Sequence, residues 1–193
     1  MMLPISREDA LKLVRKYNQD SQDLVHVLES EAIMRDLAVR LGEDSEYWAM
    51  LGLLHDIDWG VTKQDSRQHL TKAHEILNRA GFDDKFIQIV LSHGYGWDCA
   101  GLKEKRREGK VEHALASAET VTGLIHAYAL MRGRKVSDMD VSGLKRKFRD
   151  KKFAAGVNRD IILECEKTAL TLDEFMQISI DAIKKIAEEV GLN

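Results

Sequence analysis

Four side chains that could bind a metal ion stand at positions expected to face the interior of a helical protein. They are His26, His55, Asp56 and Glu119. Imidazole and carboxylate donors together suit Zn, Mn, Fe or Co, whereas Mg prefers oxygen ligands alone. A few such ligands around an open coordination position are typical of a catalytic metal, which supplies an activated water. The sequence therefore predicts one divalent transition metal held by these four residues.

The pair His55–Asp56 closes an apolar helical run. Trp48 lies seven residues before His55, which places the histidine on the buried side of the expected helix. Adjacent helical residues do not face each other, but both can reach an ion at the helix's C-terminal end. Gly52, one turn earlier, is expected to keep that groove open. An ionised Asp56 among leucines and isoleucine would be costly without a cation, and this is the physical reason to expect a metal.

The other candidates come from helical periodicity. His26 falls on the same apolar stripe as Ile33, and Glu119 lies on the inward face of a later helix. A lone histidine on such a face is more often a core residue, whereas a buried glutamate is rare unless it is paired or coordinated. His69 and His93 lie between them in the chain and would make a second metal site if Asp56 bridges the two ions.

The elements that position these residues are expected to be helices. The 193-residue chain has one proline, 44% hydrophobic and 32% charged residues, a composition typical of a helical globular protein. Caps and stripes predict an all-α bundle of roughly eight to nine helices. They are expected at 6–17, 20–41, 44–55, 66–80, 83–93, 111–131, 141–151, 158–167 and 173–190. Residues 57–65 are expected to form a loop, and 94–110 a mobile loop that covers the site.

The length predicts a single domain over residues 1–193, with a helical core at about 20–131 and C-terminal helices at about 140–190 packed on it. Two cysteines without metal-site spacing, and the lack of a signal peptide, favour a cytoplasmic protein. No apolar run is long enough to span a membrane. Nothing in the sequence indicates an oligomeric state.

A basic segment follows the candidate ligands. Between Arg132 and Arg159 there are ten basic and three acidic residues, a local charge of +7 in a chain whose net charge is −3. One interpretation is a solvated helix face, and the other is a basic wall for an anionic substrate. Nucleic acid is the less expected partner, because few aromatic residues are interleaved with the charges.

Several motifs resemble one family. They are GLLHDID at 52–58, LSH at 91–93, TGLI at 122–125 and KRKFRDKKFAAGVNR at 145–159. The order of a histidine, the HD pair and a later acidic residue is similar to that of the HD-domain metal-dependent phosphohydrolases. The closest resemblance is to a compact bacterial and archaeal subgroup of HDIG type, whose substrate is unassigned.

The resemblance implies a helical bundle in which His26 is the first metal ligand and His55 and Asp56 are the signature pair. Glu119 corresponds to the final ligand, where the family normally has aspartate. His69 and His93 match histidines that line the site or hold a second metal.

Two functions follow as hypotheses. The first is hydrolysis of a phosphomonoester or phosphodiester, such as a nucleotide or another small phosphate ester. Asp56 would help to position the nucleophile, His93 would act as general acid or second-metal ligand, and Lys147 and Arg159 would neutralise phosphate charge. The alternative is a non-catalytic sensor that binds a metal and an anionic ligand. A helical interaction domain without a metal is the remaining possibility.

Overall fold

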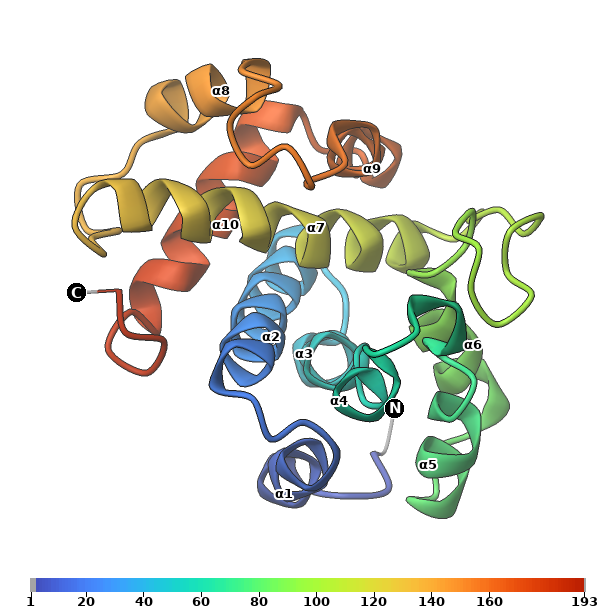
Figure 1. Ribbon diagram of the computed structural model, residues 1–193. Helices are drawn as coiled ribbons and strands as arrows, with labels where there is room; N and C mark the ends of the chain where they lie inside the picture. Colours follow the sequence, from blue (N-terminus) through green and yellow to red (C-terminus); the bar gives the residue numbers. More distant parts are fainter. Residues whose placement is uncertain (1–2, 193) are drawn as a thin grey trace.

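Two long helices, α2 (Ser21–Leu41) and α7 (Lys110–Met131), pack against each other at the centre of the molecule. The computed structural model describes residues 3–192 (Figure 1). Helix α3 (Ser45–Leu54) packs along α2, and α10 (Leu172–Lys185) contacts α2 on another side. Helix α2 therefore contacts both a helix that follows it directly in the chain and one from the C-terminal part.

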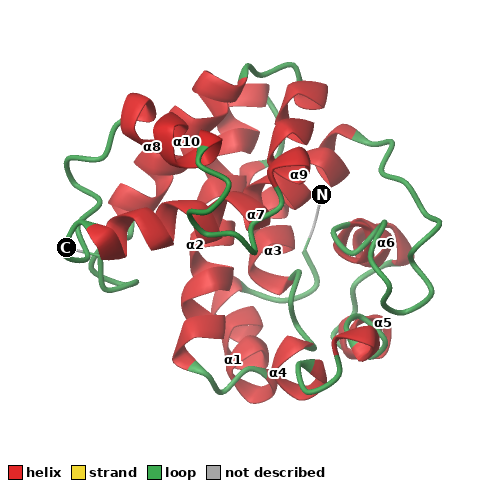
Figure 2. Cartoon of the chain, turned by 45° about the horizontal axis from the view of Figure 1, so that its top comes forward, coloured by secondary structure: helices red, strands yellow, loops and turns green. Residues whose placement is uncertain are grey.

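Shorter helices surround this centre. They are α1 (Arg7–Tyr17), α4 (Trp59–Thr62), α5 (Ala73–Arg79), α6 (Asp84–Ser92), α8 (Val141–Arg149) and α9 (Arg159–Leu163), with 3-10 helices η1 (Ser66–Gln68) and η2 (Glu164–Thr168). Figure 2 shows helices and loops but no strand within residues 3–192. The predicted all-α fold is confirmed, and α4 is the one α-helix with no counterpart among the expected segments.

Local caps determine where most helices begin and end. The side chains of Asp20, Asp44 and Asp83 each accept a hydrogen bond from a backbone amide in the first turn of α2, α3 and α6. Gly42 ends α2 in the left-handed conformation, at φ +71°. Capping of this kind depends only on neighbouring residues, so these boundaries agree with the prediction from sequence.

The segment that follows the HD pair differs from the prediction. One helix over 66–80 was expected, but η1 ends at Gln68, Leu70 has a φ of +68°, and α5 begins only at Ala73. The cause is Asp58, whose buried carboxylate accepts hydrogen bonds from the amides of Leu70 at 3.1 Å and Lys72 at 3.0 Å. This interaction breaks the helix and leaves His69 in a turn.

Close contact between α2 and α3 depends on Gly52. A Cβ at this position would lie 2.6 Å from the carbonyl oxygen of Ser30 and 2.9 Å from the Cα of Glu31. The glycine is therefore required for helix packing, and not for the open groove expected from sequence. Because α3 lies directly on α2, His55 at the end of α3 comes beside His26.

One cluster of buried hydrophobic side chains includes Ala10, Leu37, Phe175 and Leu192, and thus residues from the central and the C-terminal helices. Helix α10 ends at Lys185, five residues earlier than predicted. The extent of the domain stays a prediction. Within residues 3–192, no helix combines the length and the apolar character needed to cross a membrane.

Candidate metal centre

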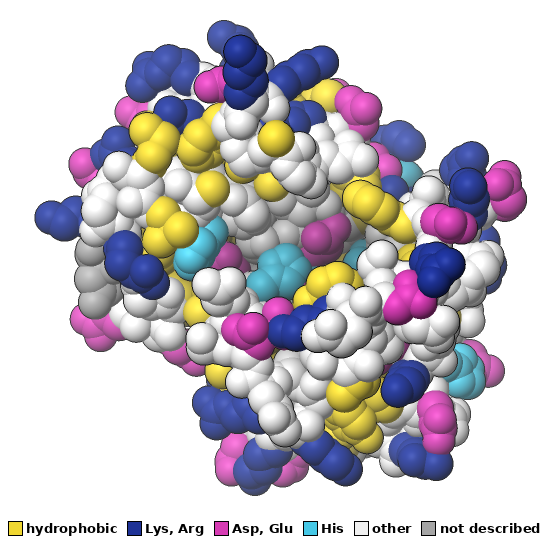
Figure 3. Space-filling model, viewed as in Figure 1, with side chains coloured by type: hydrophobic (Ala, Val, Ile, Leu, Met, Phe, Trp, Pro, Cys, Tyr) yellow, Lys and Arg dark blue, Asp and Glu magenta, His cyan; other side chains and the backbone are white. Residues whose placement is uncertain are grey.

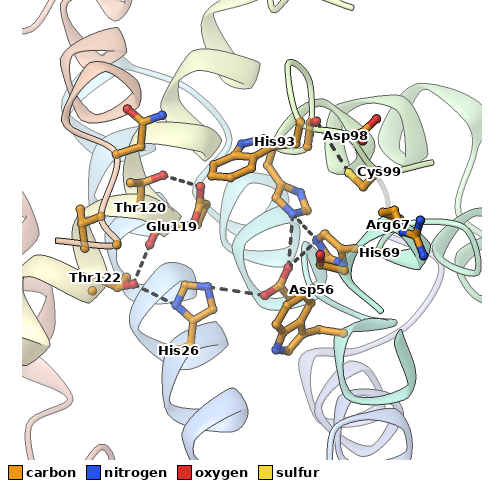
Figure 4. Close-up of a pocket in the computed structure, with 18 residues that line it drawn as sticks. His26, Asp56, Arg67, His69, His93, Asp98, Cys99, Glu119, Thr120 and Thr122 are labelled. Carbon is orange, nitrogen blue, oxygen red and sulfur yellow. Dashed lines mark hydrogen bonds and ion pairs between the residues drawn. The ribbon is translucent and has the colours of Figure 1, made fainter. Parts of the chain in front are cut away.

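Asp56 lies between two pairs of histidines, and Figure 4 shows three of them, His26 on one side of the carboxylate and His69 and His93 on the other. On one side, the Nε2 atoms of His26 and His55 are 3.0 Å apart, and each is 3.6 Å from Asp56 Oδ2. On the other side, the Nε2 atoms of His69 and His93 are 3.0 Å apart and lie 3.3 and 3.2 Å from Asp56 Oδ1. The two oxygens of one carboxylate thus face two different histidine pairs. We call these sets the His26 group and the His69 group.

Backbone carbonyls orient two of these histidines. The Nδ1–H of His55 donates to the carbonyl of Gly52 at 2.8 Å, and that of His93 donates to the carbonyl of Val90 at 2.7 Å. With the proton on Nδ1, a neutral imidazole presents the lone pair of Nε2. Both rings are held in this way at the C-terminal ends of their helices. Such bonds from the second ring nitrogen are typical of histidines that bind metals.

His26 has the same arrangement through a side chain of α7. The hydroxyl of Thr122 donates to the carbonyl of Glu119 at 2.6 Å, so its oxygen can accept the Nδ1–H of His26 at 2.9 Å. The Nε2 lone pairs of His26 and His55 then face each other, which is unfavourable unless a cation lies between them. Two bonds of about 2.1 Å at about 90° would place two nitrogens about 3.0 Å apart. The residues present therefore fit a divalent ion.

The electrostatics favour cation binding. Burial lowers the pKa of His55 to about 3, against the effect of Asp56, and keeps its ring neutral. Burial alone would raise the pKa of Asp56, but His55, His69 and His93 outweigh it and hold that pKa well below its usual range. Burial opposes the charge on His69 too, yet Asp56 and Asp58 raise its pKa to about 10. At neutral pH a metal ion would have to displace that proton.

Asn18 fixes the backbone of the HD turn. This buried side chain donates to the carbonyls of Asp56 at 3.2 Å and Ile57 at 3.3 Å, and accepts the amide of Gly60 at 2.6 Å. From sequence it was only part of a break between helices. An asparagine at such a break is a weak signal, because its partners lie about forty positions away in the chain.

Arg107 anchors the end of α6 that carries His93. Its Nη1 donates to the carbonyls of Ser92 at 2.9 Å, Tyr95 at 3.0 Å and His93 at 3.3 Å. Glu164 accepts from the same guanidinium at 2.7 and 2.8 Å. The loop expected to be mobile therefore contains an arginine, with a side chain only 7% exposed, that ties it to η2. No local pattern in the sequence separates this arginine from its exposed neighbours.

Asp58 provides a test of how the His69 group is positioned. The Asp58→Ala variant is expected to bind metal about 10- to 100-fold more weakly at the His69 group, because it frees the turn that carries His69. Nδ1 of His69 also lies 3.3 Å from Asp58 Oδ1 and would lose this partner. Metal titration followed by calorimetry should show that the metal affinity of the His26 group is unchanged.

Asp65→Ala is the matched control, since Asp65 caps η1 but contacts neither group. An equal loss of metal affinity at both groups in Asp58→Ala would show that Asp58 does not act on His69 specifically. The same loss of affinity at the His69 group in Asp65→Ala would show this as well.

Both groups contribute to the wall of a cavity of about 600 Å³, and His55 alone among their members is fully buried behind it. Figure 3 shows histidine and acidic side chains at the floor of a hollow on this face of the molecule. Most Lys and Arg side chains lie toward the outer edge of the face. The lining also comes from the α6–α7 loop, α7 and the loop before α9. Its residues are His26, Asp56, Trp59, Ser66, Arg67, His69, His93, Gly94, Trp97, Asp98, Cys99, Glu119, Thr120, Thr122, Gly123, Gly156, Val157 and Asn158.

Glu119 lies in the cavity wall but belongs to neither group. Its carboxylate accepts a hydrogen bond from the hydroxyl of Thr120 at 2.5 Å (Figure 4). Burial raises the pKa of Glu119, although His93 and His26 oppose the shift. Its role as fourth ligand stays a prediction, and it would require the carboxylate to turn away from Thr120.

The structure does not place Lys147 and Arg159 in the cavity lining. The ammonium of Lys147 lies over the ring of Phe153, 4.7 Å from its centroid. The guanidinium of Arg159 donates to the carbonyls of Ala154 and Val157, each at 2.6 Å. Both cations therefore contact the loop before α9, and their role in binding phosphate stays a prediction. Among the described lining residues the Lys or Arg is Arg67, and no pattern in the sequence singles it out.

Comparison with known proteins gives one match. Residues 24–142 match the model of a family described as HD domain, which is more than half of the chain. No curated protein and no solved structure matches significantly. The matched segment contains all five residues of the two donor groups and Glu119.

Proposed function

Because this chain belongs to the HD-domain family, whose members are generally metal-dependent phosphohydrolases, we propose that it hydrolyses a small phosphate ester at the groups around Asp56. The substrate would be a phosphomonoester or phosphodiester, with nucleotides in this class. One observation carries the proposal: a single carboxylate shared between two histidine pairs at the floor of a cavity. Such an arrangement suits one or two ions.

Each residue has a defined part in this proposal. His26 and His55 with Asp56 Oδ2 would hold one ion, and His69 and His93 with Asp56 Oδ1 a second. Nitrogen and oxygen donors together favour Mn, Fe, Co or Zn over Mg. A divalent ion in such a site lowers the pKa of a coordinated water and polarises a phosphoryl oxygen. Nδ1 of His93 donates to the carbonyl of Val90, and Nε2 faces Nε2 of His69, where a metal ion would lie. The geometry therefore favours His93 as a ligand over His93 as general acid.

Glu119 is placed to handle a proton. Its half-buried carboxyl faces the cavity, and a pKa raised by burial allows that group to hold a proton nearer to neutral pH. It could therefore protonate the leaving oxygen as the ester bond breaks. This role and the predicted ligand role are alternatives for the same carboxyl group.

The second candidate is a sensor that binds a metal and an anion without turnover. The position of Glu119, outside both donor groups, favours it. In either case the two cysteines are free and buried, which fits a reducing compartment such as the cytoplasm. We also propose that the chain acts as one domain.

Hydrolysis by metal-loaded protein separates these functions. Protein loaded with Mn, Co, Fe or Zn is expected to hydrolyse p-nitrophenyl phosphate, its diester or a nucleotide, and His55→Ala is expected to lose this activity. His74→Ala is the control, because His74 is an exposed histidine outside both groups. Stoichiometric metal binding without hydrolysis of any ester in the panel would favour the sensor instead.

A further inference from the structure

The cavity lining contains little positive charge. Arg67 is the one Lys or Arg among the described lining residues, and its Nε and Nη2 already bind Asp65 at 2.9 and 3.0 Å. Two carboxylates outside the ligand set, Asp98 and Glu119, lie in the same lining. The cations of the basic segment, including Lys147 and Arg159, are absent from the described lining. Beyond the metal groups, the cavity therefore has few partners for additional phosphates.

The same cavity has an aromatic wall. Trp97, on the loop between α6 and α7, is 51% exposed although it lines the cavity. Trp59 lies deeper and contacts His69 edge-to-face, with ring centroids 5.1 Å apart. An exposed large aromatic side chain at a cavity is a surface on which a planar ligand can stack. Asn158 and Asp98 add hydrogen-bonding groups to the same lining.

The charge balance favours a single phosphate. A phosphomonoester carries about −1.5 to −2 at neutral pH, and a metal centre can neutralise it. Further phosphates of a di- or triphosphate would meet no free Lys or Arg among the described lining residues, and the Asp98 carboxylate there would repel them. A cavity of about 600 Å³ is of ordinary size for a small-molecule ligand.

We propose that the substrate has one phosphate group and a planar aromatic organic part, as in a nucleoside monophosphate, and that Trp97 is the side chain on which this part stacks. This inference rests on the proposed phosphohydrolase function. It narrows the substrate class, and it makes Trp97 a specificity residue that takes no part in bond cleavage.

A substrate series tests the class. Metal-loaded protein is compared on adenosine 5′-monophosphate, 1-naphthyl phosphate, glycerol 1-phosphate and adenosine triphosphate. The kcat/KM for the two aromatic monophosphates is expected to exceed that for the other two by about 10-fold or more, the size of one stacking interaction. Equal values for glycerol 1-phosphate, or for the triphosphate, would overturn the proposal.

Variants of Trp97 test the residue. Trp97→Ala should raise the KM for the aromatic esters about 10-fold and leave the KM for glycerol 1-phosphate unchanged. Trp97→Phe should keep a KM for the aromatic esters close to that of the unchanged protein. Val61→Ala, at another exposed apolar side chain outside the lining, is the control. An equal effect of Trp97→Ala on aromatic and aliphatic esters, or no effect on either, would contradict the proposed stacking.

A binding measurement distinguishes failure of this inference from failure of the proposed function. If no ester is hydrolysed, calorimetry of metal-loaded protein with adenosine 5′-monophosphate and glycerol 1-phosphate still applies. Tighter binding of the nucleotide, weakened in Trp97→Ala, supports the ligand class even though hydrolysis has failed. Equal affinity for the two compounds overturns it.

Discussion

The Asp56→Asn variant is expected to lose metal binding at both donor groups together and to lower kcat/KM by at least about 10²- to 10³-fold. The reason is that Asp56 alone contributes an oxygen to each group, Oδ2 to the His26 group and Oδ1 to the His69 group. The substitution keeps the size of the side chain but removes its charge. Elemental analysis after metal loading, together with steady-state kinetics, measures both effects.

Variants that remove one histidine from a single donor group show whether the metal loss in Asp56→Asn is specific to the shared carboxylate. His55→Ala should reduce binding at the His26 group, and His69→Ala at the His69 group, each leaving the other in place. Asp84→Asn is the matched control, since Asp84 is an exposed aspartate outside both groups. Retention of one full equivalent of tightly bound metal in Asp56→Asn would show that the carboxylate is not shared.

The second large effect is on stability. Gly52→Ala is expected to lower the free energy of unfolding by at least about 3 kcal/mol, since the new methyl group would overlap the backbone of α2. For a chain of this length that corresponds to a melting temperature about 6–12 °C lower. Relief of the overlap would move α3 away from α2 and His55 away from His26, so metal affinity at the His26 group should fall as well.

Thermal unfolding by circular dichroism measures this effect. Gly156→Ala is the control, because a Cβ there meets no atom within 4 Å and the backbone is not left-handed. A melting temperature for Gly52→Ala within the range of that control would mean that α2 and α3 do not pack as closely as described.

Much of the bundle can be predicted from sequence because caps and apolar stripes are local. Asp44 and Asp83 mark helix starts by accepting nearby amides, and the stripe on α2 correctly places His26 toward the interior. Periodicity also assigned His55 and Asp56 to one helix end. These features explain why the order of the helices and the position of the HD pair could be predicted together.

The differences arise where single side chains form hydrogen bonds that periodicity and capping patterns do not predict. Asp58 breaks the expected helix by bonding amides twelve and fourteen positions later, and only this break brings His69 to Asp56. Arg159 has the charge of a phosphate ligand, yet nearby carbonyls use its donors. Composition alone cannot predict such bonds. Glu119 lies in the cavity wall, on the inward face expected from periodicity, but periodicity does not predict its hydrogen bond with the adjacent Thr120.

The most direct test of the shared carboxylate is a crystal structure of the protein loaded with Mn, with anomalous scattering recorded at the Mn edge. We expect two anomalous peaks, one beside Asp56 Oδ2 between His26 and His55, and one beside Asp56 Oδ1 between His69 and His93. Anomalous peaks only at other positions, or full occupancy by ions that Asp56 does not contact, would contradict the proposed metal centre.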